Sequence, residues 1–407
     1  MRFFFIQLIL LVFFSSGISQ EILPLKSRAE IIDKIQKDRL DNILPQLMSK
    51  SNLDMWVLIA REYNEDPVIK TLLPATWLNA RRRTILVFSL DKKTNAVERV
   101  AITRYPFGKL IPSIWDKEKE PDQWKALADY ITSKKPNKIG VNISEHFALA
   151  DGLVKTDYDG LKNALPENYQ TKIVSAEKLA ISWIETRTDF EMVLFSQLVE
   201  ITHSIIKEAF SNKVIKVGQT TTDDVVWWMR EKVLSLGLDT WFHPTIDVQR
   251  SDNSDLYAFD GQSKYDVIQY GDLLHCDFGI SYLSLNTDCQ QLAYVLSPGE
   301  KAAPDFLNEA LDQGNRVQDI FTTNFKLGVS GNETLRKSLQ DAREEGLRPQ
   351  IYTHPLGTFG HSAGTTFGMW DSQDGVPIKG DYPLQLNTSY AIELNTKVYI
   401  SQWGKDI

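Results

Sequence analysis

Short apolar runs separated by polar stretches characterise the first part of the chain. Upstream of them, apolar residues recur at helical spacing between residues 32 and 47, and Ser27 with Glu30 matches the pattern of a capping box. The runs with strand character are Trp56–Ala60, Thr84–Ser89, Val97–Thr103 and Lys138–Asn142. This alternation predicts an α/β domain over residues 20–178.

Residues 179–407 combine longer helical patterns with strand-like runs. Thr188 and Glu191 match a second capping box, and an apolar stripe continues from it to Ile205. Further helices are expected at 221–236, 304–326 and 332–345, the last ended by Gly346. Strand-like runs are Thr245–Val248, Leu273–Gly279, Asp288–Leu296 and Ser389–Ile400. This region is therefore predicted to mix helices with antiparallel strands.

The N-terminus has the pattern of an export signal. Arg2 precedes the run Phe3–Phe14, and small residues follow it up to Ser19. A run of 12 residues is too short to span a bilayer as a helix. We expect residues 1–19 to be a signal peptide, and the mature protein to be periplasmic or secreted with no membrane span. An uncleaved anchor is the alternative.

The composition narrows the function classes. A formal net charge of −8 argues against nucleic acid as a partner, because surfaces that bind it concentrate Lys and Arg. We interpret the run Arg81–Arg83 as a solvated strand entrance rather than an anion site. Two cysteines in an exported chain do not form a disulfide scaffold, so the apolar core must supply the stability.

Two acids, Asp277 and Asp288, interrupt apolar strand-like runs and stand 11 residues apart. If a hairpin places Asp277 opposite Asp288, both carboxylates emerge on one face and repel each other unless a cation lies between them. A two-residue turn at Tyr282 and Leu283 is disfavoured because neither is Gly or Asn, so a longer loop is expected. A pair of exposed acids on a sheet face is the alternative.

The same register would place the two cysteines, Cys276 and Cys289, opposite each other. By strand alternation both thiols would point away from the carboxylates. We expect free thiols here, and a cross-strand disulfide is the alternative.

Two histidines and one further acid could complete a site. His354 and His361 lie in a segment punctuated by glycines, which let backbone and ligand approach closely around His361. Either histidine alone could be structural. Glu393 alternates with apolar residues in "SYAIELNTKVYI", and a half-buried Glu needs a partner. A donor set of two Asp, one His and one Glu favours Mn²⁺, Co²⁺, Fe²⁺ or Zn²⁺ over a thiolate site.

In order along the chain, "DFGISYLSLNTD", "GHSAG" and "AIELN" resemble the pita-bread metallopeptidases of the aminopeptidase P, prolidase and creatinase type. The resemblance implies an α+β pita-bread catalytic domain over residues 179–407, in which helices flank an antiparallel sheet. A smaller α/β creatinase-type N-terminal domain over residues 20–178 would precede it.

The resemblance also implies a dinuclear site with two divalent ions, Mn²⁺ being favoured over Zn²⁺, Co²⁺ or Fe²⁺. Asp277 would bind one ion, Asp288 would bridge both, and His361 with Glu393 would hold the second. Glu393 is also the position that resembles the family's proton shuttle. Two such ions would activate a bridging water and polarise the scissile carbonyl.

Three departures from the family pattern bear on this expectation. The family has a fifth ligand, a second Glu on a later strand, and only 14 residues follow Glu393. We therefore expect the domain to be truncated at its C-terminus, with little turnover in the 407-residue form. Cys289, followed by two Gln, replaces the family's Thr and Arg, and Trp370 stands where a substrate-binding His is common. His354 or His243 could supply that imidazole.

The expected function is hydrolysis of the N-terminal peptide bond of short peptides, with Xaa-Pro peptides as a favoured class. The alternatives are an inactive peptidase-like fold used as a binding module and a metal-free creatinase-like amidinohydrolase. The clustered carboxylates argue against the second of these, because a site without metal has no physical need for them. The resemblance makes a homodimer plausible.

Overall fold

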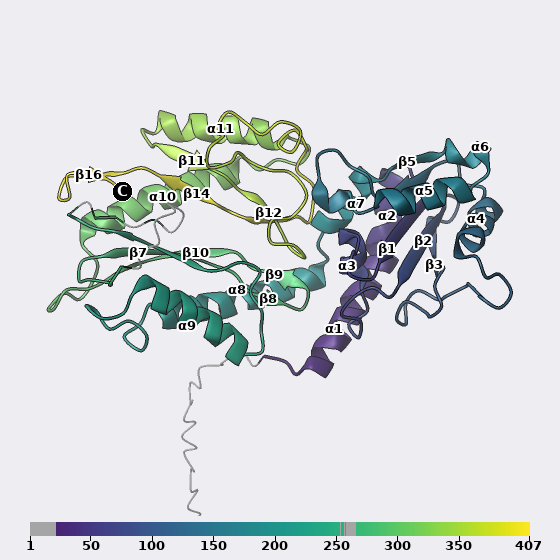
Figure 1. The fold of residues 1–407 in the computed structure, drawn as a ribbon. Coiled ribbons are helices and arrows are strands. Elements are labelled where there is room, and N and C mark those ends of the chain that lie inside the picture. The colour runs from purple at the N-terminus through teal and green to yellow at the C-terminus, as the bar shows by residue number, and fades with distance from the viewer. Residues whose placement is uncertain (1–21, 253, 256, 258–265) are drawn as a thin grey trace, which may run out of the picture.

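The computed structural model describes residues 22–252, 254, 255, 257 and 266–407. The expected signal peptide, residues 1–19, lies outside them. The described chain forms two regions that lie side by side and meet along the helices α7 (Glu177–Glu185) and α8 (Asp189–Ala209) (Figure 1). Among the described residues, no helix has the length and apolar character needed to cross a membrane.

The N-terminal region is built on a mixed five-stranded sheet in the order β3-β2-β1-β4-β5. Strand β1 pairs antiparallel with β2 and parallel with β4. The strands are β1 (Met55–Arg61), β2 (Arg83–Asp91), β3 (Ala96–Ala101), β4 (Ile139–Val141) and β5 (Ile173–Ser175). The helices are α1 (Leu25–Asp38), the π-helix η1 (Arg39–Ile43), α2 (Leu44–Lys50), α3 (Pro67–Leu72), α4 (Gln123–Lys134), the 3₁₀-helix η2 (Ala148–Ala150), α5 (Lys155–Ala164) and α6 (Glu167–Gln170).

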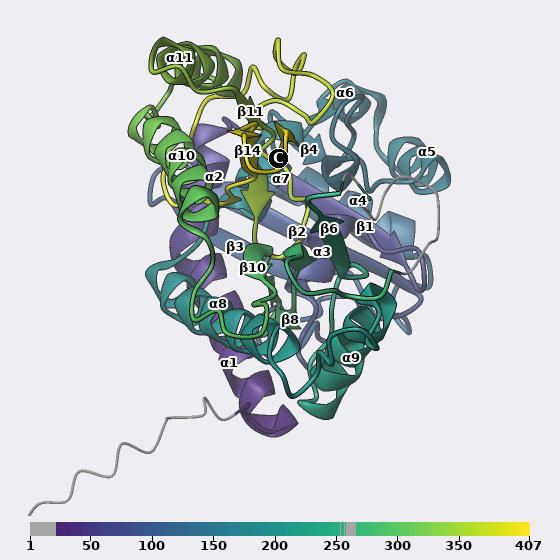
Figure 2. The ribbon, with the colours of Figure 1, turned by 90° about the vertical axis from the view of Figure 1, so that its left-hand side faces the viewer.

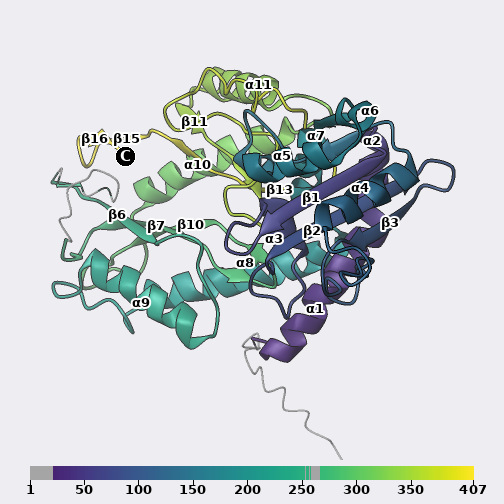
Figure 3. The same ribbon diagram turned by 45° about the vertical axis from the view of Figure 1, so that its right-hand side comes forward.

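Helices cover both faces of this sheet, and the central strand β1 is accordingly apolar on both sides. Figure 3 shows helices on both sides of the sheet. Trp56 and Leu58 pack into one core cluster with α2, α3 and α7, whereas Val57 and Ile59 pack into another with α4 and α5. This burial explains why the strand is a continuous apolar run rather than an alternating one. Each such side chain contributes roughly 1.5–3 kcal/mol when it is fully buried.

The C-terminal region contains two strand layers, each with helices on its outer side. Its helices are α8, α9 (Thr222–Ser235), α10 (Asp305–Thr323) and α11 (Gly331–Glu344). Its strands are β6 (Thr245–Gln249), β7 (Leu273–Phe278), β8 (Ser281–Tyr282), β9 (Leu285–Asn286), β10 (Cys289–Tyr294), β11 (Pro349–Ile351), β12 (His354–Leu356), β13 (Ser389–Ala391), β14 (Leu394–Thr396), β15 (Tyr399–Ile400) and β16 (Lys405–Asp406).

The two strand layers bury opposite faces. The sheet β10-β7-β6 packs its apolar face on α8 and α9, and the strands β11 and β14 pack theirs on α10 and α11. Figures 1 and 2 show the strands between these two pairs of helices. The faces that the helices do not cover therefore turn toward each other, and they carry the polar residues of both layers.

The register of the β7–β10 hairpin differs from the prediction. Asp277 lies opposite Gln290, not Asp288, and Cys276 lies opposite Gln291. The strands β8 and β9 extend the hairpin to a two-residue turn at Leu283 and Ser284, both with positive φ (54° and 62°). The expected longer loop is therefore wrong. A shift of two positions leaves each side chain on its predicted face, because side chains alternate with a period of two.

The two capping boxes have different outcomes. The prediction for Ser27 is wrong, because α1 already begins at Leu25 after Pro24, without a side-chain cap. The prediction for Thr188 and Glu191 is confirmed: each side chain accepts a hydrogen bond from the other residue's backbone N–H. Glu191 therefore stabilises the first turn of α8.

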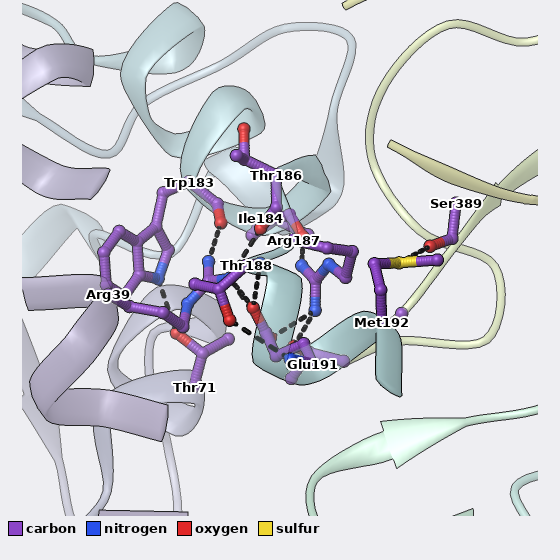
Figure 4. Close-up of polar contacts among 12 residues, drawn as sticks. Arg39, Thr71, Trp183, Ile184, Thr186, Arg187, Thr188, Glu191, Met192 and Ser389 are labelled. Carbon is purple, nitrogen blue, oxygen red and sulfur yellow. Dashed lines mark hydrogen bonds and ion pairs between the residues drawn. The ribbon is translucent and has the colours of Figure 1, made fainter. Parts of the chain in front are cut away.

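Glu191 also lies between two buried arginines where the two regions meet (Figure 4). Its carboxylate accepts hydrogen bonds from Arg39 Nη1 at 2.9 Å and from Arg187 Nη1 at 3.0 Å. Arg39 belongs to η1 and also donates to the backbone carbonyls of Trp183 and Thr186. All three charged side chains are at most 6% exposed, so this junction is a fully buried ionic network.

Replacing Glu191 by Gln is expected to lower the free energy of unfolding by about 3–5 kcal/mol, because two buried guanidinium groups lose their counter-charge. Urea denaturation at pH 7 measures this. The matched control is Asp159→Asn, which breaks the exposed Lys155–Asp159 pair and should leave the unfolding midpoint nearly unchanged.

The same pair of variants tests the pH dependence. Burial opposes ionisation of Glu191, but the two guanidinium groups outweigh it and hold its pKa below the ordinary value. Its contribution is therefore present above the unfolded carboxyl pKa of about 4.3 and is lost as the pH falls. The difference between wild type and Glu191→Gln should shrink below about pH 4; a constant difference would contradict this assignment.

Candidate metal centre

Five side chains from the two facing strand layers and from the loop after β12 converge in the C-terminal region. They form two overlapping groups whose ligand atoms lie within 4.8 Å of one another: Asp277, Asp288 and Glu393, and Asp288, His354 and His361. Asp288 belongs to both groups. The expectation from the family resemblance joined Glu393 to His361, whereas this geometry joins Glu393 to Asp277.

Strand pairing explains why these residues meet. Asp277 on β7 and Asp288 just before β10 project from one face, since Asp288 is two positions from the partner of Asp277. In the other layer, His354 pairs with Ala391, and the Tyr352 N–H donates to the Glu393 carbonyl. One continuous register therefore places His354 and Glu393 on the same face of that layer.

Asp277 shows the electrostatic consequence of this convergence. Burial raises its pKa to about 8, and the neighbouring carboxylates of Asp288 and Glu393 add to the effect. Its Oδ1 atom is buried and has no hydrogen bond within the described part of the chain. Without a cation, Asp277 is therefore most stable in its protonated form at neutral pH.

His354 lies inside the cluster, although the sequence pointed to it only as a substrate-binding residue. Its Nδ1 is 3.0 Å from the Pro355 carbonyl, so Nδ1 carries a proton and donates it there. Nε2 faces Asp288 Oδ2 at 3.5 Å and Glu393 Oε1 at 3.7 Å and has no hydrogen bond among the described residues. Burial alone would lower the pKa of His354, but these carboxylates outweigh it and raise it to about 10.

His361 approaches the cluster from the glycine-rich loop that follows β12. Its ring lies 4.6 Å from the ring of His354 and 5.1 Å from that of Trp241, edge to face in both cases. Partial burial and the neighbouring His354 lower the pKa of His361. His361 is thus favoured as a neutral imidazole, which is the form that binds a metal.

The other residues considered from the sequence lie elsewhere. His243 is exposed and contacts Arg230 at 3.3 Å and the ring of Trp227 at 5.2 Å. Trp370 is 70% exposed. His275 has both ring nitrogens paired, with Asp247 at 3.1 Å and with Gln290 at 3.2 Å.

Both cysteines are free thiols. Cys276 is buried against the helices behind the sheet, on the face opposite Asp277. Because the observed register places Gln291 rather than Cys289 across from it, the two cysteines are not a directly opposed pair. Neither thiol faces the carboxylates.

The donor set fits divalent cations. Three carboxylates and two imidazoles are ligands that Mn²⁺, Co²⁺, Fe²⁺ and Zn²⁺ accept. The buried atoms Asp277 Oδ1 and His354 Nε2, which have no hydrogen bond among the described residues, face the point where a cation would relieve the repulsion. The carboxylate of Asp288 is common to both groups.

Comparisons with known proteins bear on the family and on the fold. The family model described as metallopeptidase family M24 matches residues 194–407. Comparison with curated protein sequences gives no match.

Solved structures are similar over nearly the whole chain. An X-Pro aminopeptidase from Thermotoga maritima has a TM-score of 0.61 at 15% identity, covering 89% of this chain and 92% of that one. A putative aminopeptidase P from Bacillus anthracis has a TM-score of 0.58 at 11% identity (93% and 90% covered). A prolidase from Pyrococcus furiosus has a TM-score of 0.53 at 15% identity (89% and 94% covered). The α+β pita-bread fold expected from the sequence is confirmed.

The stability of the protein stripped of metal by a chelator should fall with rising pH because of Asp277. Its folded pKa lies above the unfolded value of about 3.9, so its contribution to stability is lost as the pH rises from about 4 to 8. In the presence of chelator, the Tm of Asp277→Asn should rise relative to that of wild type as the pH increases from 6 to 9. Added Mn²⁺ should stabilise wild type more than the variant. Equal Mn²⁺ stabilisation of both proteins would contradict a role of Asp277 as a ligand.

Proposed function

The chain belongs to metallopeptidase family M24, and from this premise we propose that it hydrolyses the N-terminal peptide bond of short peptides with two divalent metal ions. Metal-dependent peptide hydrolysis is the activity that the family supports. The observation that carries the proposal of two ions is the pair of donor groups that share Asp288.

We assign the ligands of the two ions from the two donor groups. Asp277, Asp288 and Glu393 would hold one ion, and Asp288, His354 and His361 the other. Divalent ions at such a site lower the pKa of water, polarise a carbonyl and stabilise the developing oxyanion. Mn²⁺ is the ion we favour, with Zn²⁺, Co²⁺ and Fe²⁺ as alternatives, because oxygen donors outnumber nitrogen donors.

Proton transfer is assigned to side chains of the same cluster. The Glu393 carboxylate is the proposed proton acceptor from the attacking water and the donor to the leaving amine. As an alternative to its role as a ligand, His354 could bind the substrate carbonyl through the same Nε2, which lies 3.7 Å from Glu393 Oε1. His243 contacts Arg230 and Trp227 rather than a residue of the metal cluster, and its role in substrate binding stays a prediction.

The preference for proline in the second position rests on the similar structures. These similar proteins include an X-Pro aminopeptidase, an Xaa-Pro dipeptidase and a prolidase. Their structural similarity, at 15% identity, shows the shared fold alone, so the substrate class is part of our proposal and has its own test.

With Mn²⁺ added, the purified protein should release the first residue of Ala-Pro-Ala faster than that of Ala-Ala-Ala. Asp288→Asn should lower kcat/KM by about 10³-fold, roughly 4 kcal/mol of transition-state stabilisation. The exposed Asp312→Asn on α10 is the matched control and should retain full activity.

Other outcomes separate the alternatives. Equal rates on the two peptides would remove the Xaa-Pro preference and keep the peptidase. A wild-type protein that retains no metal and cleaves neither peptide would favour the binding module. Hydrolysis of creatine that survives chelation, with neither peptide cleaved, would favour the metal-free amidinohydrolase.

We also propose that residues 1–19 direct export and are removed. Expression of the full chain in a host with a secretory system should give an exported protein whose N-terminus lies near Gln20, as intact mass would show. Recovery of the full-length chain in the membrane fraction would instead support an uncleaved anchor. A homodimer stays a prediction.

A further inference from the structure

The loop that carries His361, residues 357–364, has no regular secondary structure, yet it is held from several sides. The Asn286 backbone N–H donates to the Gly357 carbonyl at 2.8 Å, and its side chain donates to the Thr358 carbonyl at 2.8 Å. Gly360 packs against the Trp241 ring, where an added Cβ would come within 2.3 Å of a ring atom. We refer to residues 357–364 as the His361 loop.

The segment between α7 and α8 contacts both ends of the His361 loop. At one end, Arg187 Nη1 donates to Thr358 Oγ1 at 3.3 Å, and a Cβ added at Gly357 would lie 3.0 Å from the Arg187 Cζ atom. At the other end, a Cβ added at Gly364 would lie 2.5 Å from Glu185 Oε2. The backbone of the loop therefore rests directly on these two side chains.

Both contacting side chains are buried. Arg187 is 0% exposed, and its guanidinium also bonds Glu191 at 3.0 Å and the Ile184 carbonyl. Glu185 is 3% exposed. Glu191 is in turn bonded to Arg39, so a chain of buried contacts runs from η1 in the N-terminal region to the His361 loop.

We propose that Arg187 is a positioning residue of the metal centre: it connects the Arg39–Glu191 junction to the His361 loop and sets where His361 stands relative to Asp288 and His354. The proposal rests on the proposed function, since it takes His361 as a ligand. Partners that orient a metal ligand without touching the metal commonly change metal affinity by 10–100-fold when they are removed. Arg187 acts here through backbone position rather than through a hydrogen bond to the imidazole.

Two variants distinguish a positioning role of Arg187 from a role in stability alone. Arg187→Lys keeps a positive charge for Glu191, but its single ammonium would have to replace both Nη1, which donates to Glu191 and Thr358, and Nη2, which donates to the Ile184 carbonyl. Thr358→Val removes only the hydroxyl that Arg187 contacts and leaves the Arg39–Glu191–Arg187 network unchanged. Both variants should fold, and both should move His361.

The test uses the full chain, stripped of metal and titrated with Co²⁺, whose visible absorption reports ligand geometry. Arg187→Lys should weaken Co²⁺ binding by roughly 10–100-fold and alter the absorption band. Thr358→Val should act in the same direction by about 2–10-fold, the range expected for one hydrogen bond. Thermal unfolding of the metal-free variants confirms that each is folded.

The control is Asp157→Asn. Asp157 is a fully buried carboxylate in the N-terminal region, paired with Arg61 and Arg83 at 3.2 Å, and it has no contact with the His361 loop among those recorded for it. This variant should lose stability while retaining wild-type Co²⁺ affinity and spectrum. The same loss of affinity in Asp157→Asn would overturn the proposal, because general loosening would then explain the effect.

The remaining outcomes are decisive as well. Folded Arg187→Lys and Thr358→Val proteins with wild-type Co²⁺ affinity and spectrum would overturn the positioning role and leave the proposed function standing. A wild-type protein that binds no Co²⁺ would refute the proposed function itself, and the positioning role with it.

Discussion

Repulsion among three carboxylates is the constraint on which the rest of the catalytic region depends. Asp277, Asp288 and Glu393 are brought within a few ångströms by two strand layers that meet at their polar faces. Two unit charges 4 Å apart repel by about 4 kcal/mol at an effective dielectric constant of 20. A fold that holds three together needs a strong scaffold and a proton or cation between them. The helices behind each layer supply the scaffold, because the apolar faces of both layers are buried on them.

The chemical character of the centre could be predicted from the sequence because it depends on side-chain alternation. Asp277 and Asp288 were expected on one face and lie on one face, although their pairing is two positions away from the expected one. The error arose at the turn, where Leu283 and Ser284 adopt a left-handed conformation that their residue types do not indicate. An error of one position would have separated the acids.

The place of His354 could not be predicted in the same way. Its proximity to Glu393 depends on the pairing of β12 with β13, two short strands separated by more than thirty residues of irregular chain. Sequence alternation gives the face of a strand but not its partner, and pairing over such a distance is set by the packing of both strands on the helices behind them. The alternation of side chains did carry part of the answer. If the two segments pair antiparallel with Tyr352 opposite Glu393, His354 lies on the same face as Glu393.

The buried junction at Glu191 raises a different question, since apolar side chains of similar volume often stabilise a fold at least as well as a buried ionic network. The His361 loop offers a reason for charge at this position. It lacks a strand or helix to fix its backbone, and dispersion contacts alone are not directional. A guanidinium held by Glu191 presents its donors in one plane and in one orientation, so it can fix Thr358 in a way that a leucine could not. We therefore interpret the network as fixing the geometry of the His361 loop more than as adding stability.

On this interpretation the π-helix η1 also contributes to the geometry of the loop. Arg39 is its first residue and donates to Glu191 and to the backbone carbonyls of Trp183 and Thr186, which precede Arg187.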